Sequence, residues 1–308
     1  MNKITFSQAL NGYELYFNAR HLSKNTFNDY FNTFNKFIDF LGTDPPIDKI
    51  TSKDIEAFLA DQDHLANKTL LNYHTGLSAL WTWCVREDMV NEHIVQKVDR
   101  PKPEQPEIQP YTKGDVRALL SALKKSKVYL RPGMKESKNT LQTADRNRAI
   151  ILLLLDTGVR SSELCQVLMH HTDLKNREII VMGKGRKERI LPFCARTGQA
   201  LWRYLASRRE DSADDFLFVT EVHNPFDRHY LRRMLSRIGE RAGVNRVGVH
   251  RFRHTFAINY LRNGGDPFSL QRLLGHSTME MVKRYLNIVQ ADLTKNHKLA
   301  SPVDNWRL

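Results

Sequence analysis

The stretch REIIVMGKGRKERILPF, residues 177–193, decides the fold class, because it carries the only clear strand signal in the chain. Two short β-prone runs, EIIVM and ERILPF, flank a turn rich in Gly and Lys. This arrangement is typical of a β-hairpin. Elsewhere the apolar residues recur mostly at helical spacing. The sequence therefore predicts a mainly α protein with a small antiparallel β-sheet.

A proline-rich stretch divides the chain. Residues 101–110 read PKPEQPEIQP, with prolines at positions 101, 103, 106 and 110. Proline lacks an amide donor and disfavours helix in the residue before it, so this stretch is predicted to be an extended linker. The sequence thus predicts one domain over 1–100, a second over 111–290 and a C-terminal tail over 291–308.

The first domain is predicted to be a bundle of about four helices. Ser23 can cap a helix whose apolar stripe runs from Phe27 to Leu41. Thr51 with Asp54 resembles the capping box of the next helix, and a longer helical pattern runs from about Asn67 to Arg86. Aromatic residues on these stripes are predicted to form the core.

The second domain is predicted to be helical around the hairpin. Thr112 and Asp115 open a helix, and the apolar pattern of about 144–157 predicts a buried one. Residues 125–143 are polar and contain Pro132–Gly133, which favours a loop or insertion. Further helices are predicted near 197–208, 227–241, 250–263 and 268–274, followed by the segment that carries Tyr285.

The charge balance points to a polyanionic partner. The 308 residues include 47 Lys and Arg against 34 Asp and Glu, a formal charge of +13 with a pI of about 9.7. Residues 1 to 100 hold 10 basic against 13 acidic residues, and the rest of the chain holds 37 against 21. Nucleic acid is the commonest partner of such a surface; a basic but merely solvated surface is the alternative. The second domain is where an anion is expected to bind.

Several classes of protein are disfavoured. The longest apolar run, AIILLLL at 149–155, is too short to span a bilayer, and the N-terminus lacks the pattern of a secretory signal. Three cysteines far apart in sequence indicate a reducing cytoplasm. Without a CxxC pair or an HExxH motif, no metal site is indicated. We expect no membrane association and no cofactor.

Four motifs stand out in the basic half: TGVRSSEL (157–164), GKGRK (183–187), HRFRH (250–254) and LLGHSTMEMVKRY (273–285). Each has an ordinary interpretation alone. Arg160 can be a surface residue near a helix end, Lys184 a turn residue and His276 a helix cap, while Tyr285 can be a core aromatic. Together they place several cations and imidazoles near one tyrosine, in the half with the surplus positive charge.

In combination, the motifs resemble those of the tyrosine recombinase, or phage integrase, family of site-specific DNA recombinases. The resemblance covers nearly the whole chain and is strongest over 144–290. It implies a helical, SAM-like core-binding domain followed by a mixed α/β catalytic domain of the DNA breaking–rejoining type. The residues that match the family's catalytic positions, in order and context, are Arg160, Lys184, His250, Arg253, His276 and Tyr285.

The resemblance assigns roles that fit phosphoryl chemistry. Attack on a phosphodiester builds a transition state with about two negative charges, which a metal-free enzyme must neutralise with its own cations. Arg160 and Arg253 would clamp the two non-bridging oxygens, because guanidinium forks donate paired hydrogen bonds to phosphate. His276 would be a third donor. Glu163 would hold an Arg or a His in place; its alternative is a plain helix-surface carboxylate.

The remaining roles concern protons. Tyrosine has a reference pKa of about 10, so a Tyr285 nucleophile needs a base or a positive field. The resemblance offers His250 as that base or as an orienting donor. Lys184, in the hairpin turn, would protonate the leaving 5′-oxygen. A 3′-phosphotyrosyl intermediate conserves the bond energy, so rejoining would need neither ATP nor a metal.

The family also implies an assembly. Four protomers would hold two double-stranded DNA core sites and exchange strands through a Holliday junction, and the tail would pack on a neighbouring protomer or on its own domain. The predicted DNA contacts are Lys24, Asn25, Lys68, Thr69, Asn72, Arg186, Lys187, Arg228, Arg232 and Arg233. Two alternatives stay open: a type IB topoisomerase-like or telomere-resolving enzyme, and a DNA-binding relative without activity.

Overall fold

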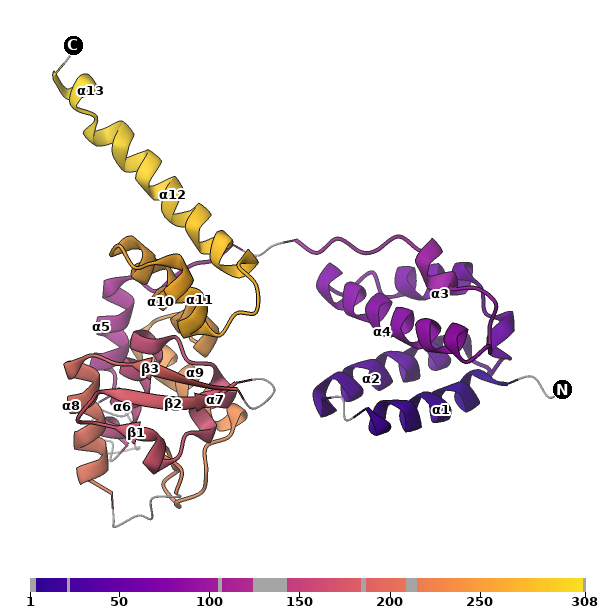
Figure 1. Ribbon diagram of the computed structural model, residues 1–308, viewed down its shortest axis with the longest axis horizontal. Helices are drawn as coiled ribbons and strands as arrows, with labels where there is room; N and C mark the ends of the chain where they lie inside the picture. The colour runs from indigo at the N-terminus through magenta and orange to yellow at the C-terminus, as the bar shows by residue number, and fades with distance from the viewer. Residues whose placement is uncertain are drawn as a thin grey trace, which may run out of the picture. The chain divides into compact units, whose positions relative to one another are not determined.

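The computed structural model describes residues 4–20, 23–104, 107–123, 143–183, 187–208 and 215–306, with the side chains of 291–296, 298–300 and 304 excepted. They fall into two compact units, Met1–Glu107 and Ile108–Leu308 (Figure 1). Most of the predicted loop at 125–143 lies outside the described residues, as do Lys184 and Arg186 of the predicted site.

The first unit is a helical bundle. Its elements are α1 (Phe6–Ala19), α2 (Lys24–Leu41), η1 (Ile47–Lys49), α3 (Ser52–Asp61), α4 (Asn67–Arg86) and η2 (Ile94–Lys97). The Ser23 hydroxyl accepts a hydrogen bond from the Thr26 amide, and Thr51 and Asp54 form the reciprocal capping box. These caps satisfy amides that the first helical turn leaves without partners, and they confirm the predicted starts of α2 and α3.

Aromatic side chains fill the core of this bundle. Trp81 of α4 is fully buried, and its ring lies 6.2 Å from that of Phe6 and 6.4 Å from that of Phe37, centroid to centroid. Phe37 also packs edge-on against Phe58 of α3 at 5.2 Å. Each such ring contributes roughly 2 kcal/mol or more by leaving water. The helical stripes of the sequence thus face one shared core, as predicted.

The second unit surrounds a three-stranded antiparallel sheet in the order β1 (Thr172–Asp173), β2 (Glu178–Met182), β3 (Glu188–Pro192). The predicted hairpin is confirmed as β2 and β3, and β1 joins its outer edge. The helices and the remaining 3₁₀ turn are α5 (Lys113–Ser121), α6 (Ala144–Thr157), α7 (Ser161–Gln166), η3 (Met169–His171), α8 (Ala195–Ala206), α9 (Arg228–Ala242), α10 (Val249–Arg262), α11 (Pro267–Leu274), α12 (Glu280–Ala300) and α13 (Pro302–Trp306).

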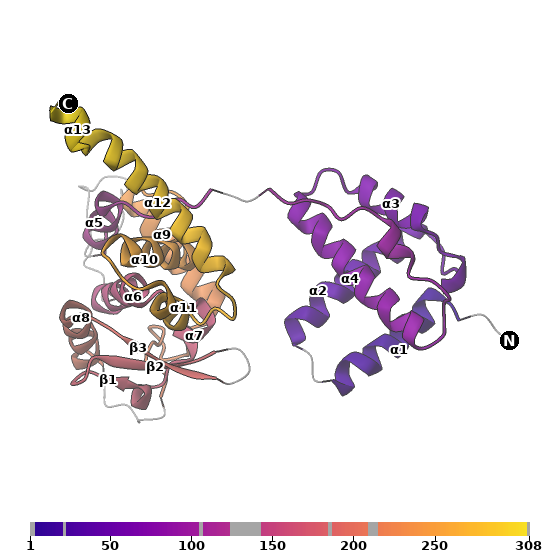
Figure 2. The same cartoon turned by 45° about the horizontal axis from the view of Figure 1, so that its top comes forward.

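Helix α6 occupies the centre of this unit. It packs against both α8 and α10 (Figure 2), and most of its residues from Arg146 to Thr157 are buried, as its apolar sequence predicts. Gly158 ends the helix with a φ of +61°. A left-handed residue at this position turns the chain sharply, and it delivers Arg160 to the first position before α7.

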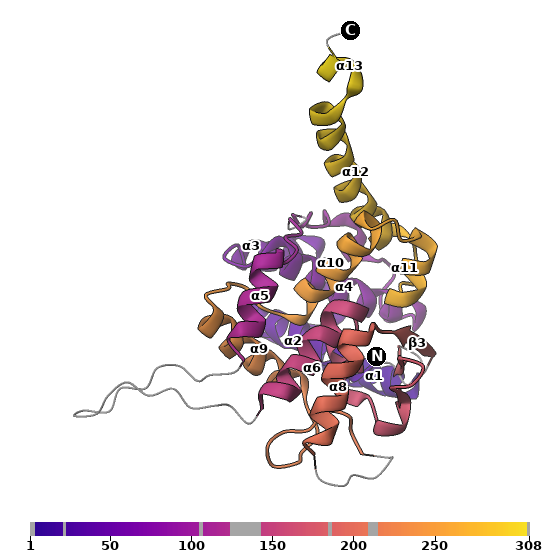
Figure 3. The ribbon, with the colours of Figure 1, turned by 90° about the vertical axis from the view of Figure 1, so that its left-hand side faces the viewer.

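A smaller apolar cluster joins α10, α11 and α12, with Ile258, Leu270, Val282 and Tyr285 among its members. Beyond this cluster α12 continues away from α10 and α11 toward α13 (Figure 3). The predicted tail at 291–308 therefore begins inside the helix that carries Tyr285. None of the helices in the described part of the chain is long and apolar enough to cross a membrane.

Candidate active site

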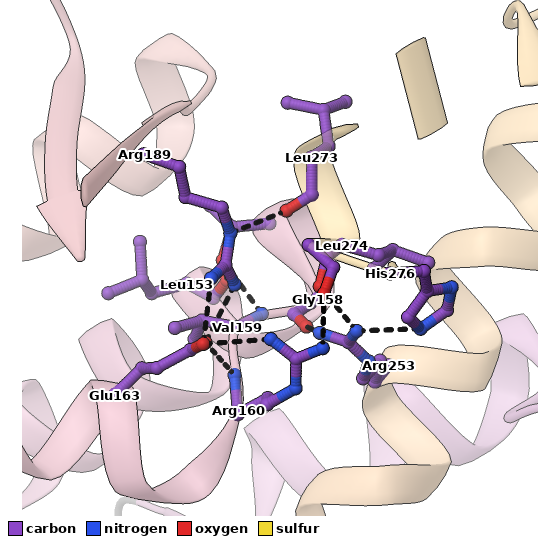
Figure 4. A network of polar contacts seen from close by, with 12 residues as sticks. Leu153, Gly158, Val159, Arg160, Glu163, Arg189, Arg253, Leu273, Leu274 and His276 are labelled. Carbon is purple, nitrogen blue, oxygen red and sulfur yellow. Dashed lines mark hydrogen bonds and ion pairs between the residues drawn. The ribbon is translucent and has the colours of Figure 1, made fainter. Parts of the chain in front are cut away.

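Glu163 is the centre of a polar network that joins α7, β3 and α11 (Figure 4). Its side chain is only 3% exposed. Arg189 of β3 donates to both carboxylate oxygens at 2.7 Å, and Arg160 donates to one of them at 2.9 Å. Burial raises the pKa of Glu163, but the bonds from Arg189 and Arg160 outweigh it, and the pKa lies below its usual value. The carboxylate is therefore charged at neutral pH.

Arg160 faces the open side of this network. Its backbone amide donates to Glu163 at 2.9 Å, and its Nη2 donates to the Gly275 carbonyl at 2.8 Å. The Arg160 side chain is 33% exposed, compared with 14% for Arg189. An anion approaching from solvent can therefore reach the Arg160 guanidinium while Glu163 holds one of its edges.

Arg253 lies deeper, on α10. Its Nη1 donates to the Gly158 carbonyl at 2.8 Å, and its Nη2 donates to the Leu274 carbonyl at 2.6 Å. Burial, followed by the neighbouring positive charge of Arg160, lowers the pKa of Arg253 to about 10, so the side chain remains protonated at neutral pH. The two arginines of the predicted clamp thus bind adjacent carbonyls, those of Leu274 and Gly275.

His276 completes this convergence. Its Nε2 lies 2.8 Å from Nη2 of Arg253. A guanidinium can only donate, so Nε2 is the acceptor and the neutral ring carries its proton on Nδ1. Burial and the charges of Arg253 and Arg160 lower the pKa of His276 to about 4. The histidine is therefore neutral here, and the positive charge of the site belongs to the arginines.

Tyr285 is fully buried, at 1% exposure, in the cluster between α10 and α12. Its hydroxyl is hydrogen-bonded to Nδ1 of His254 at 2.8 Å. Burial raises the pKa of Tyr285, against the opposing effect of Arg253 and Arg284. Burial likewise lowers the pKa of His254 to about 4, assisted by His250. In this position the pair is a neutral phenol and a neutral imidazole.

The structure gives less information on the two remaining predicted catalytic residues, His250 and Lys184. His250 lies one helical turn before His254 and is exposed; in the described region, the Tyr285 hydroxyl is bonded to His254. Lys184 lies outside the described residues, although the β2–β3 hairpin that flanks it does not. Lys187, the first described residue after Gly183, lines an open groove together with Arg160, Arg189 and His276.

The predicted DNA contacts that the structure describes are mostly at the surface. Lys24, Asn25, Lys68 and Asn72 are exposed and Thr69 is half-buried, and in the second unit Lys187, Arg228, Arg232 and Arg233 are exposed. Tyr30 and Thr33 of α2 approach Gly76 of α4, while Lys36 lies over the Tyr73 ring. These contacts make α2 and α4 antiparallel, so their first turns lie at opposite ends of the bundle.

Two residues of the network were not predicted from the sequence. Arg189 stands two residues after the GKGRK motif, and His254 is the last letter of HRFRH. Their proximity to that motif and to Arg253 was the only available signal. Strand alternation could have suggested that Arg189 points to one face of the hairpin, but it could not name Glu163 as its partner.

The geometry suits the binding of a phosphate diester. Three guanidiniums and one carboxylate meet beside an open groove, and the two half-buried histidines next to them are neutral. Among the described residues, no group of three or more His, Cys, Asp or Glu side chains could hold a metal ion. The side chains on hand can neutralise an anion and exchange protons with it.

Solved structures share this architecture at low sequence identity. The Tn1549 transposon integrase in complex with transposon right end DNA aligns with a TM-score of 0.74 and 21% identity, covering 94% of this chain and 99% of that one. The XerH site-specific recombinase bound to a palindromic difH substrate aligns with a TM-score of 0.71 and 20% identity, covering 97% and 85%. These similarities establish the fold.

Sequence relatives point the same way. Tyrosine recombinase XerC of Anoxybacillus flavithermus is 29% identical over 291 residues, 90% of each chain. XerC of Staphylococcus saprophyticus is 35% identical over 168 residues, 54% of this chain and 57% of its own. The phage integrase family model matches residues 115–291, and the model of the phage integrase N-terminal SAM-like domain matches 10–91. With more than half of its length matched, the chain belongs to the phage integrase family of tyrosine recombinases, enzymes of site-specific DNA recombination.

Proposed function

We propose that this enzyme cleaves and rejoins double-stranded DNA at specific core sites, with Tyr285 as the nucleophile. The observation that carries the proposal is the convergence of Arg160 and Arg253 on the adjacent carbonyls of Gly275 and Leu274, with the His276 ring bonded to Arg253. Three side chains far apart in sequence meet within one hydrogen-bonded network, beside a groove open to solvent.

A phosphate entering this groove would exchange with the backbone carbonyls. Arg160 and Arg253 each donate to a carbonyl oxygen that is neutral, and a phosphate oxygen is a stronger acceptor because it is charged. Hydrogen bonds to charged groups contribute about 1.5–3 kcal/mol each. The arginines are thus held in place before DNA arrives, and little reorganisation is required when it binds.

The covalent step balances without any cofactor. The Tyr285 oxygen forms a bond to phosphorus, the bond from phosphorus to the 5′-oxygen breaks, and the DNA 3′-phosphate becomes a tyrosyl ester. The phenol proton passes to a base, for which His250 was the sequence expectation and His254 is the group in contact. Lys184 would protonate the leaving 5′-oxygen. Reversal with a new 5′-hydroxyl rejoins the strand.

Tyr285 must leave its buried position for this attack. It is held by α12, which begins only five residues before it, after the loop 275–279. Gly275 in that loop has a φ of +62°, and the segment also carries His276. We propose that DNA binding moves the start of α12 so that the phenol enters the groove, while Arg160 and Arg253 remain in place.

Assembly forms part of the proposal. Solved relatives are described as a dimer bound to a core site, for the lambda integrase, and as a post-cleavage complex on a palindromic substrate, for XerH. By analogy, four copies of this chain would pair two DNA sites and form a Holliday junction, and the segment from residue 291 would pack against a neighbouring copy. Cys84, Cys165 and Cys194 are free thiols, which supports a cytoplasmic location.

The test begins with the DNA site. Duplexes bound by the protein are selected from a randomised pool, and the recovered core site is then prepared with a nick that traps the cleaved strand. Incubation and a denaturing gel should reveal a covalent protein–DNA adduct with the wild-type chain and none with Tyr285→Phe. The matched control is Tyr204→Phe, at another buried tyrosine of the second unit, which should leave the adduct intact.

A second assay addresses recombination itself. Two labelled core sites incubated together should yield a four-way junction that contains strands of both. An adduct without junctions would indicate a relaxing enzyme in place of a recombinase. Binding of the selected site without any adduct would refute the assignment of Tyr285 as a nucleophile.

A further inference from the structure

Arg189 makes three hydrogen bonds within the network, yet it belongs to none of the motifs that identify the site. It donates to both oxygens of Glu163 at 2.7 Å, and its Nε donates to the Leu273 carbonyl at 2.9 Å. One side chain of β3 therefore binds α7 and the end of α11 together. Its side chain is only 14% exposed, so it is not an ordinary surface arginine.

The position of Arg189 bears directly on Arg160. A Cβ built on Gly275 would lie 3.1 Å from Nη1 of Arg189 and 3.3 Å from Nη1 of Arg160, so both guanidiniums crowd the same residue. Both also donate to the same Glu163 oxygen, Oε1. The two guanidinium groups thus compete for one buried carboxylate. Arg189 donates to both of its oxygens, whereas the Arg160 guanidinium donates to only one.

The net charge that the network offers to a phosphate depends on how Glu163 is shared between the two arginines. We define the clamp as Arg160, Arg189, Arg253, Glu163 and His276. With the imidazole neutral, three guanidiniums and one carboxylate leave two positive charges. The phosphorane transition state carries about two negative charges. Without Arg189 the clamp would retain only one positive charge, because Glu163 would then be neutralised by Arg160 alone.

We propose, on the basis of the proposed function, that Arg189 is a positioning residue for strand cleavage: by binding both oxygens of Glu163, it keeps that carboxylate from neutralising Arg160. Arg189 does not touch the phosphate in this scheme. It acts through Glu163, which then orients Arg160 by one edge and leaves the rest of that guanidinium directed at the groove. Loss of Arg189 would draw Arg160 into a full ion pair with the buried carboxylate.

Three variants separate this role from simple structural support. Arg189→Met removes one positive charge, so that Arg160 becomes the only guanidinium of the clamp that pairs with Glu163. Arg189→Met combined with Glu163→Gln removes both charges of the pair and restores two net positive charges. Arg189→Lys keeps the charge but loses the fork. Arg203→Met, an exposed change on α8, is the control for loss of a cation elsewhere.

The assay is single-turnover cleavage of the nicked core site, with thermal unfolding and DNA binding recorded for every variant. Arg189→Met should cleave about 100-fold more slowly, the loss typical of one missing transition-state donor, because Arg160 would then be paired with Glu163 and lost to the phosphate. The double variant should recover at least about tenfold of that loss, and Arg203→Met should cleave at the wild-type rate. A double variant no faster than Arg189→Met, although folded and able to bind DNA, would overturn the inference.

A second substrate separates the proposed role from a merely structural one. Misfolding of the variant would slow cleavage of both substrates equally. In a methylphosphonate duplex, one non-bridging oxygen is replaced by a methyl group, so the transition state carries one negative charge fewer. If Arg189 protects the charge of Arg160, the loss in Arg189→Met should shrink to about tenfold or less on this duplex. An equal loss on both substrates would reject the role. Cleavage by the wild-type chain in the same assay shows separately that the proposed function holds.

Discussion

The hydroxyl of Tyr285 and Nδ1 of His254 lie 2.8 Å apart, and the tyrosine ring is buried in the apolar cluster of α10, α11 and α12. His254 directly follows Arg253, which reaches toward the Gly158 and Leu274 carbonyls. The two neighbours on α10 thus serve different parts of the site: Arg253 belongs to the proposed anion clamp, and His254 binds the hydroxyl of Tyr285, the proposed nucleophile. The imidazole satisfies a hydroxyl that would otherwise be buried without a partner.

Removal of this imidazole should expose the tyrosine. In His254→Leu the buried phenol loses its hydrogen bond, a cost of about 1–3 kcal/mol that favours its outward position. Nitration of Tyr285, followed by peptide mass analysis, should become at least about fivefold faster. His254→Asn, whose amide can replace Nδ1, should react more like the wild type. Nitration of the buried Tyr204 is the internal reference. Equal nitration of Tyr285 in His254→Leu and the wild type would contradict the prediction.

The two clamp arginines should differ in their effects on stability. Arg253 is 5% exposed and bonded to two carbonyls and His276, so Arg253→Met should lower the free energy of unfolding by about 3 kcal/mol. Arg160 is partly exposed, and Arg160→Met should cost about 1 kcal/mol or less. Urea unfolding measures both values. Both variants should lose the covalent adduct, and equal stability losses would show that the burial difference has no energetic weight.

The turn before Arg160 should tolerate no side chain. Gly158 is left-handed, and a Cβ on it would lie 2.7 Å from Cδ1 of Phe256. Gly158→Ala should therefore cost about 2–4 kcal/mol through backbone strain and steric overlap together. Gly243 has a similar φ of +66° but nothing within 4 Å of its Cβ position, so Gly243→Ala should cost only the backbone part, about 1–2 kcal/mol. Thermal unfolding of the pair tests the difference, and similar melting temperatures would contradict it.

Acid should weaken the fold before most carboxylates titrate. The pKa values of His254 and His276 are lowered to about 4 in the folded chain, against about 6.5 in an unfolded one. Between these values only the unfolded chain binds the protons, so the free energy of unfolding decreases as pH falls from 6.5 toward 4 and is fully present above 6.5.

Each of these histidines should contribute about 1 kcal/mol of that loss by pH 5, after allowance for partial solvent screening. Urea unfolding at pH 7, 6 and 5 measures the slope. The double variant His254→Leu with His276→Gln should show a shallower slope over the same range. An unchanged slope would place the pH dependence on other groups.

Local chemistry explains what could be predicted from the sequence. The caps at Ser23 and Thr51, the hairpin at 177–193 and the buried helix at 144–157 depend on residues within a few positions of one another, so periodicity and capping chemistry suffice. The motifs around Arg160, Arg253, His276 and Tyr285 are also local, and their order along the chain indicated the family.

Contacts between distant segments could not be obtained in this way. Arg189 and Glu163 are 26 residues apart, and His254 and Tyr285 are 31 apart. Their pairing depends on how β3 meets α7 and how α12 packs on α10. The antiparallel order of α2 and α4, which separates Lys24 from Lys68, is likewise a property of the whole bundle.

The sequence by itself determined the fold class, the division into a helical domain and a mixed domain, and the set of basic residues and tyrosine that make up the site. Each of these follows from patterns confined to single elements. Only the tertiary structure decided that Arg189 shares Glu163 with Arg160, and that His254 binds a phenol buried away from the groove. A buried charge or hydroxyl must find its partner wherever packing places one, and packing is set by the whole chain.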